Sequence, residues 1–265
     1  MLYHNEQKVI RAETSDFQMV ALSVIGDRSE QQDSFGYFFS EDSGIVVICD
    51  GMGGHQGGKL ASDVAVKTFL SHYNKDYLLF PQTDKVIDVA KEADRMVFGL
   101  KTDRNEPLNA GSTVVSITIT QKRLMWCAVG DSRAYLIRGE EMVQITQDHN
   151  YHTVLVEQMN AGILDQKTFE SEDVRGDALI SFLGIGNLSL IDYSNSSLKL
   201  QSDDRIILMS DGLYKIVTDD EIIRVLDNFS NIEDAIKVLE MKAAKNAKRD
   251  AVSRDNMTVA LIKIK

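Results

Sequence analysis

The chain has 265 residues, of which 43% are hydrophobic and only 2 are proline, and its formal net charge is −11. This length and composition favour a globular chain with a full core and exclude a disordered or fibrous one. The acidic balance argues against nucleic acid as a partner, and the aliphatic runs are too short to span a membrane.

The first residues of the chain and its two cysteines indicate the cellular compartment to expect. The first ten residues, MLYHNEQKVI, have no basic start followed by an apolar run, so we expect no secretory signal. Cys49 and Cys127 lie inside apolar, strand-like runs, which argues against a disulfide framework. We therefore expect a cytoplasmic protein, and because no repeat or linker divides it, residues 1–265 are predicted to form a single domain.

Hydrophobic periodicity predicts the elements of the first half of the chain. Three strands come first, at Phe17–Ile25, Phe35–Phe39 and Ile45–Cys49. Two helices follow, at about Lys59–Tyr73 and Asp84–Leu100. A β-meander is predicted next, with strands at Thr113–Thr120, Leu124–Val129, Ala134–Ile137 and Met142–Ile145. The short turns between these strands make their pairing antiparallel.

The second half begins with a helix near Asn150–Ala161 and a loop-rich stretch that runs to about Asp177. Strands are predicted at Leu179–Leu183, Leu198–Leu200, Arg205–Met209 and, at the end of the chain, Thr258–Ile264. Helices are predicted at Asp219–Leu226 and Ile232–Ala247. Strand groups separated by helix groups predict an α+β fold of two antiparallel sheets with helices packed outside.

A glycine-rich loop at Gly53–Lys59 resembles a nucleotide-binding loop. It spells G-x-x-x-x-G-K, but the next residue is Leu60, which has no hydroxyl to hold Mg²⁺. The loop also begins after Asp50, a carboxylate that would repel phosphate, and the strands around it look like hairpins rather than βαβ units. We interpret the match as a glycine-rich turn.

The stretch CAVGDSR has the C-x₅-R spacing of a cysteine-dependent phosphatase. In such a loop a thiolate attacks phosphorus while backbone N–H groups bind phosphate. Here Asp131 lies inside the loop between Cys127 and Arg133, and its charge would oppose both. We expect Cys127 to be a small hydrophobic residue of a core strand.

Carboxylates recur at the ends of predicted strands, at Asp33, Asp50, Asp131, Asp211 and Asp255. One such aspartate is an ordinary turn residue. Five in an acidic chain indicate a cluster at a sheet edge, and clustered carboxylates repel one another unless a cation holds them. Since no cysteine or histidine cluster accompanies them, oxygen ligation predicts Mg²⁺ or Mn²⁺.

Arg28 lies in GDRSEQQDS, a few residues before Asp33. Its planar guanidinium could bind phosphate oxygens in a bidentate manner. Asp50 would then hold metal and the metal would hold phosphate, with Arg28 beside it. These residues together predict metal-assisted phosphate chemistry.

Seven stretches resemble, in order, the motifs of the protein phosphatase 2C family, the metal-dependent serine/threonine phosphatases, and the likeness is greatest to the short bacterial type. They are GDRSEQQDS, VICDGMGGHQGG, GSTVVSI, AVGDSRAYLIR, ITQDHN, LMSDGLYKIVTDDEI and RDNMTV. The match runs nearly end to end, and seven pieces in the family's order are highly specific. The resemblance implies an α-β-β-α sandwich with two metals in a cleft at one sheet edge.

The resemblance also implies roles for single residues. Asp50 would bridge both metals and the Gly51 carbonyl would bind one of them. Asp211 and Asp255 would complete the shell of the other metal. Asp131 with Asp211 resembles a weaker third-metal site.

Two residues of the resemblance concern substrate and water. Arg28 matches a phosphate-binding arginine, and Asp33 matches an acidic residue that orients metal-bound water. The pair before Asp33 departs from the family pattern: the family usually has Asn followed by Glu or Gln, whereas this chain has Gln31 and Gln32. The segment Gly162–Asp177 falls where the family has a variable flap.

The implied reaction is hydrolysis of phosphoserine or phosphothreonine in proteins by a water that bridges two Mg²⁺ or Mn²⁺ ions. The implied partners are phosphorylated proteins, among them a serine/threonine kinase and its substrates, and the chain is expected to be a monomer. Two alternatives remain: a pseudophosphatase that binds without turnover, and a regulatory phosphatase dedicated to one signalling partner. Intact metal ligands argue against the first.

Met52 occupies a position where many eukaryotic relatives have a histidine that is proposed to protonate the leaving group. A thioether cannot donate a proton, so we expect Met52 only to pack. The proton would then come from metal-bound water or from His55. We interpret His55 as a residue that orients the loop rather than as the acid.

Overall fold

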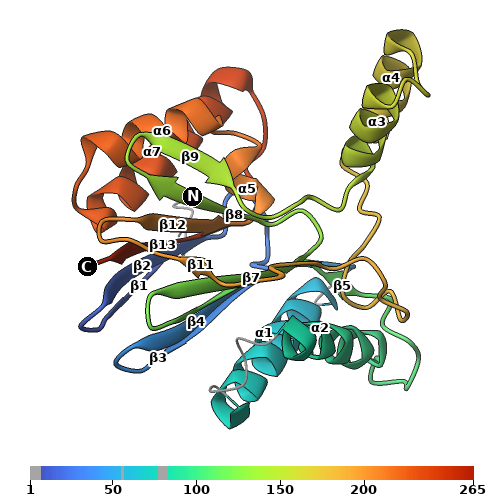
Figure 1. The fold of residues 1–265 in the computed structure, drawn as a ribbon. Helices are drawn as coiled ribbons and strands as arrows, with labels where there is room; N and C mark the ends of the chain where they lie inside the picture. The colour runs from blue at the N-terminus through green and yellow to red at the C-terminus, as the bar shows by residue number, and fades with distance from the viewer. Residues whose placement is uncertain (1–6, 55–56, 77–82) are drawn as a thin grey trace.

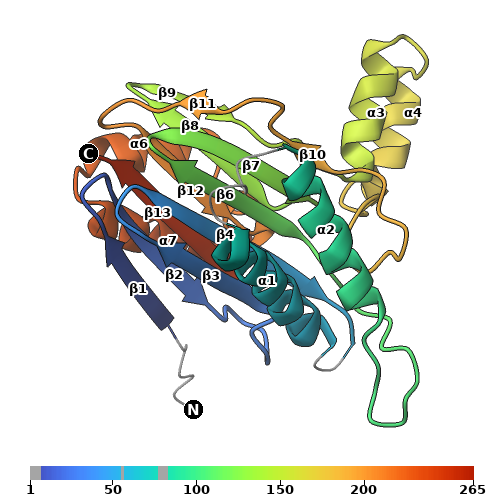
Figure 2. The same ribbon diagram turned by 60° about the horizontal axis from the view of Figure 1, so that its bottom comes forward.

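The structure, a computed structural model, describes residues 7–54, 57–76 and 83–265. Two antiparallel sheets stack face to face, and helices cover the outer face of each, so that four layers follow one another (Figures 1 and 2). This arrangement confirms the predicted α+β sandwich.

The first sheet has the strand order β1-β2-β13-β12-β8-β9. Its strands are β1 (Gln7–Glu13), β2 (Phe17–Val24), β13 (Met257–Ile264), β12 (Arg205–Met209), β8 (Arg133–Arg138) and β9 (Glu141–Gln144). Three helices cover its outer face: α5 (Asp211–Tyr214), α6 (Asp219–Asn228) and α7 (Ile232–Asp250). Buried aliphatic residues of these helices, such as Leu213, Ile222 and Leu239, pack on the sheet.

The second sheet has the order β10-β7-β6-β4-β3, with β11 beside β7 and β5 beside β4. Its strands are β10 (Asp192–Tyr193), β7 (Arg123–Val129), β6 (Val114–Thr120), β4 (Ser43–Met52), β3 (Asp33–Phe39), β11 (Leu198–Lys199) and β5 (Gly111–Ser112). The helices α1 (Gly57–Asp76) and α2 (Thr83–Phe98) cover the outer face (Figure 2).

Besides the two hydrophobic cores between each sheet and its helices, a third hydrophobic core lies between the two sheets. Val46 and Ile48 of β4 face Leu208 and Ile262 of the first sheet across this core, whereas Val47 faces the helix side. The central strands are therefore buried on both faces. This explains why they read in the sequence as unbroken aliphatic runs rather than as alternating patterns.

A helical hairpin projects from the sandwich (Figure 1). It consists of α3 (Tyr151–Asn160), α4 (Gln166–Glu172) and the single 3₁₀ turn η1 (Asp173–Arg175). Asp165 caps α4 by accepting a hydrogen bond from the Thr168 backbone N–H at 2.8 Å. The stretch predicted as loop-rich thus contains a short capped helix.

The structure also differs from the predicted secondary structure elsewhere. The strand predicted at Leu179–Leu183 is wrong, because only isolated bridges form there, from Leu179 to Asn150 and from Leu183 to Ser112. The edge strand β1, the short strands β5 and β10 and the short helix α5 were not predicted. No helix in the described ranges is both long enough and apolar enough to cross a membrane.

Candidate active site

The ends of several strands meet at one cleft of about 680 Å³. Six of the seven predicted site residues line it: Arg28, Asp50, Gly51, Asp131, Asp211 and Asp255. They come from both sheets and from segments more than two hundred residues apart in the chain. The seventh, Asp33, is 2% exposed and pairs with Asp50 across β3 and β4, so it lies behind the cleft wall.

Asp50 and Gly51 are held at the end of β4 by backbone contacts. The Asp50 N–H donates to Thr113 Oγ1 at 3.0 Å, and the Asp50 carbonyl accepts from the Thr113 N–H at 2.8 Å. A Cβ on Gly51 would lie 2.0 Å from the Gly58 carbonyl oxygen and 2.7 Å from that of Gln32. Only glycine permits this approach, which brings β3, β4 and the start of α1 together.

Asp211 begins α5 directly after β12. Its Oδ2 atom forms an ion pair with Lys215 Nζ at 3.0 Å, one helical turn further on. Its Oδ1 atom is buried with no hydrogen-bond donor. A Cβ on the following Gly212 would meet the Asn256 carbonyl oxygen at 2.0 Å, so glycine is needed here as well.

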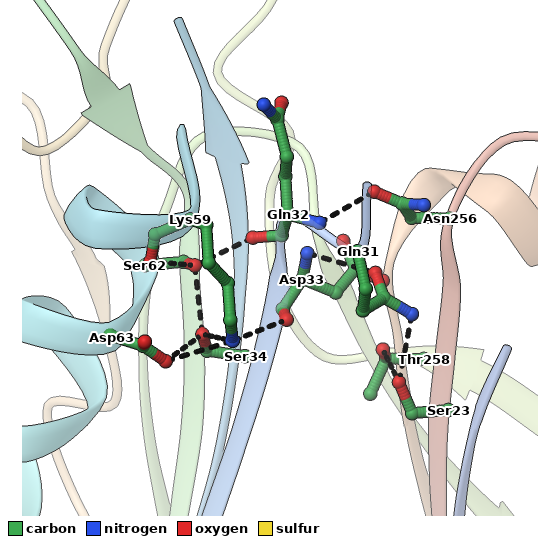
Figure 3. A network of polar contacts seen from close by, with 10 residues as sticks. All are labelled: Ser23, Gln31, Gln32, Asp33, Ser34, Lys59, Ser62, Asp63, Asn256 and Thr258. Carbon is green, nitrogen blue, oxygen red and sulfur yellow. Dashed lines mark hydrogen bonds and ion pairs between the residues drawn. The ribbon is translucent and has the colours of Figure 1, made fainter. Parts of the chain in front are cut away.

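Asp33 is part of a polar network beside the cleft (Figure 3). Its Oδ2 atom accepts a hydrogen bond from Ser210 Oγ at 2.8 Å, and its N–H donates to Gln31 Oε1 at 3.0 Å. Its Oδ1 atom is buried without a donor. Burial raises the pKa of Asp33 to about 7, and the charges of Asp211 and Asp255 add to this, while hydrogen bonds from Thr258 and Ser210 act against it.

The same electrostatic pattern extends to Asp50 and Asp131. Burial, and then the charges of Asp33 and Asp211, raise the pKa of Asp50 well above its usual range. Burial and the charge of Asp211 raise the pKa of Asp131 to about 6, against the opposing effect of Lys215. These buried carboxylates hold one another's pKa values up, which is the signature of a cluster that lacks sufficient positive charge.

Arg28 and Asp255 form the outer side of the cleft. The Arg28 Nη2 atom lies 2.6 Å from Asp255 Oδ2, and the other oxygen, Oδ1, accepts from the Asn256 N–H at 2.7 Å. Both side chains are partly exposed. Arg28 is thus in the cleft, where it forms an ion pair with Asp255.

These residues fit a divalent cation. Asp33 and Asp211 each have a buried oxygen without a donor, and the donor set is entirely oxygen. Among the described residues, no three acidic, histidine or cysteine side chains converge closely enough to hold one ion by themselves. A bound ion would therefore also draw on a backbone carbonyl and on water, which Mg²⁺ accepts readily and zinc sites seldom use.

Some residues of the site were not predicted from the sequence. Asn256 holds three segments together: its Nδ2 donates to the carbonyls of Ile25 and Glu30 at 2.9 and 3.0 Å, and its Oδ1 accepts from the Gln32 N–H at 2.8 Å. Lys215 was also missed. The Asp211–Lys215 spacing of four residues could have indicated it, because such pairs meet on a helix.

The two alternative motifs are excluded by their surroundings. Cys127 is buried in β7, and burial raises its pKa, so it cannot supply a thiolate. Lys59 donates to Ser34 Oγ and pairs with Asp63, both at 2.9 Å, and to the Asp33 carbonyl at 3.3 Å, so it stabilises the loop base (Figure 3). His55 lies outside the described residues, while Met52 lines the cleft.

Comparisons with known proteins agree with this fold. A relative from Mycoplasma genitalium is 29% identical over 247 residues, which cover 89% of this chain and 91% of that one. The serine/threonine phosphatase stp of Listeria innocua is 27% identical, with 89% and 90% covered. The solved catalytic domain of the serine/threonine protein phosphatase PstP, in complex with 2 manganese ions, superposes with a TM-score of 0.72 at 24% identity, covering 94% of this chain and 98% of that one. The family model described as protein phosphatase 2C matches residues 22–247, and the chain therefore belongs to the protein phosphatase 2C family.

Proposed function

We propose that this phosphatase hydrolyses phosphoserine and phosphothreonine in proteins with the help of Mg²⁺ or Mn²⁺ bound in the cleft. The observation that carries the proposal is the convergence of Asp50, Asp131 and Asp211 from separate segments at one cleft, with Asp33 paired to Asp50 behind it. The raised pKa values of Asp33, Asp50 and Asp131 support it. Membership of the family and the manganese ions of the PstP structure support it.

The roles proposed for single residues are those that the family resemblance implies. Asp50 and the Gly51 carbonyl would hold two ions, with Asp211 and Asp255 completing the site of one of them. Bound divalent cations supply Lewis acidity, which lowers the pKa of water and offsets charge on phosphate oxygens. Asp33 would orient the attacking water through its position beside Asp50, to which it is register-paired.

Arg28 is the residue proposed to bind the phosphoryl group. It is partly exposed at the cleft mouth, and a substrate phosphate would compete with Asp255 for its guanidinium. One arginine cannot outweigh several carboxylates, which repel a phosphate dianion. Substrate binding should therefore depend on the bound cations, as the hydrolysis step does.

We further propose that residues 1–265 form one catalytic domain, a cytoplasmic monomer that acts on phosphoproteins, including those made by a serine/threonine kinase. The matched residues 22–247 span most of the chain, which supports a single unit. The converged carboxylates disfavour a pseudophosphatase. A dedicated regulatory phosphatase would use the same cleft and would differ only in its partner.

The test compares turnover of p-nitrophenyl phosphate and of a phosphothreonine peptide in EDTA and after addition of Mn²⁺. Asp50→Asn should lower kcat by roughly a hundredfold or more, the scale of metal assistance. Asp203→Asn is the matched control, because Asp203 is exposed and has a positive φ of 68°, which asparagine tolerates. Full activity in EDTA, or an equal loss in both variants, would refute the proposal.

A further inference from the structure

Lys215 lies in the cleft between two acidic side chains from different parts of the fold. Its Nζ atom is 3.0 Å from Asp211 Oδ2 and 3.2 Å from Asp177 Oδ2. Asp211 begins α5, whereas Asp177 follows η1, where the chain returns from the projecting hairpin. All three residues line the same cleft.

The two oxygens of Asp211 have different surroundings. Lys215 binds Oδ2, while Oδ1 is buried without a donor. The charge of Lys215 also acts on Asp131, the next carboxylate of the cluster. The ammonium of Lys215 thus already provides a positive charge at the corner formed by Asp131 and Asp211. No lysine or arginine in the described residues forms an ion pair with the side chain of Asp50 or Asp33.

We propose that Lys215 is a positioning residue whose ammonium is the resident cation of the corner formed by Asp131 and Asp211, and that it keeps a divalent ion from binding there tightly. The proposal rests on the proposed function and revises one expectation from the sequence, the weaker third-metal site of Asp131 and Asp211. An ammonium hydrogen-bonded to Asp211 Oδ2 removes that oxygen from a metal shell, and its charge repels an incoming ion.

The contact with Asp177 gives the same residue a second role. Through Asp177, Lys215 connects the return segment of the hairpin to α5, which is fixed on the first sheet by the buried Leu213. An ion at the Asp131–Asp211 corner would compete for Asp211 and leave Lys215 paired with Asp177 alone. Binding at this corner and the attachment of the hairpin are therefore coupled through one side chain.

The test is calorimetric titration of the purified full chain with Mn²⁺, which measures both the number of sites and their affinities. Lys215→Met should tighten the weakest Mn²⁺ site on the order of tenfold, because a neighbouring unit charge is removed. Lys215→Arg keeps the charge and should resemble the wild type. The tightening should disappear in the double variant Lys215→Met, Asp131→Asn, because the corner then lacks its second carboxylate.

Two controls separate this effect from loss of an ordinary ion pair. Lys242→Met removes a lysine of similar exposure, which pairs with Glu221 at 3.1 Å on the helical layer, and should leave all Mn²⁺ affinities unchanged. Asp177→Asn breaks only the hairpin contact and should not tighten the weakest site. Thermal unfolding of each variant shows whether it is folded.

The outcomes distinguish this inference from the proposed function. If the wild type binds Mn²⁺ and turns over phosphopeptide, but Lys215→Met shows unchanged or weaker binding at every site, the resident-cation role is wrong while the proposed function stands. Tightening in Lys215→Arg equal to that in Lys215→Met would also overturn it, because charge would not be the cause. If the wild type binds no Mn²⁺ at all, the proposed function fails first.

Discussion

Gly51→Ala probes the close approach on which the position of Asp50 depends. The new Cβ would lie 2.0 Å from the Gly58 carbonyl oxygen, whereas ordinary contact begins at 3.4 Å. The atoms it meets are backbone atoms of Gly58 and Gln32, which cannot rotate away as a side chain would. Either β4 or the start of α1 must therefore move by more than an ångström.

The expected effects concern both stability and catalysis. Overpacking of this kind typically destabilises by about 1–3 kcal/mol, and in a domain of this size roughly each kcal/mol lowers Tm by about 2–4 °C. A displacement of about 1 Å at catalytic groups can lower the rate about a hundredfold. We therefore expect Gly51→Ala to lower kcat on that order, and to weaken Mn²⁺ binding, since the Gly51 carbonyl is a proposed ligand.

The assay pairs this variant with Gly54→Ala in the same loop. A Cβ on Gly54 would meet no atom of the other described residues within 4 Å, so this substitution changes composition without a clash against them. Turnover of p-nitrophenyl phosphate, Mn²⁺ titration and thermal unfolding are measured for both. Wild-type kcat and Mn²⁺ affinity in Gly51→Ala would show that the carbonyl position is unimportant, and an equal loss in Gly54→Ala would show that the clash is not the cause.

Three further predictions concern protons and phosphate. Burial raises the pKa of Asp33 from 3.8 to about 7, so between these pH values the metal-free folded state holds this proton while the unfolded state loses it, and stability falls as pH rises. In EDTA, the Tm of Asp33→Asn relative to the wild type should therefore rise from about pH 5 to about pH 7. A constant Tm difference would contradict this. Arg28→Ala should raise KM roughly tenfold or more, the scale of a charge-assisted hydrogen bond, while calorimetry still detects Mn²⁺; loss of Mn²⁺ binding instead would place Arg28 in the metal site. His55→Ala should lower phosphopeptide and p-nitrophenyl phosphate turnover by similar factors, whereas a loss confined to the phosphopeptide, which has the poorer leaving group, would identify His55 as the general acid.

The fold could be predicted from the sequence wherever strands are buried on both faces. The run Ile45–Cys49 is such a case, since β4 lies between the sheet-sheet core and α1. Prediction failed where neighbours decide the outcome. Leu179–Leu183 has the apolar character of a strand, yet its backbone finds only isolated bridges, and the polar edge strand β1 owes its existence to pairing with β2 along its whole length.

The site shows the same division between local and distant information. An aspartate followed by glycine at a strand end is visible in the sequence, so Asp50 and Asp211 could be found. Asn256 could not, because its partners Ile25, Glu30 and Gln32 are more than 220 residues away in the chain and no spacing rule connects them. The pairing of Arg28 with Asp255, 227 residues apart, belongs to the same class.

The two Asp-Gly pairs, Asp50–Gly51 and Asp211–Gly212, allow close packing of backbone segments rather than chain reversal. Each follows or ends an interior strand, β4 in one sheet and β12 in the other. At both Gly51 and Gly212 an added Cβ would lie 2.0 Å from a backbone carbonyl oxygen of another segment. The missing side chain lets the two backbones touch, and that contact places the preceding carboxylate at the cleft. One physical requirement therefore explains the glycine of each pair and the position of the aspartate before it, and both sheets meet this requirement in the same way.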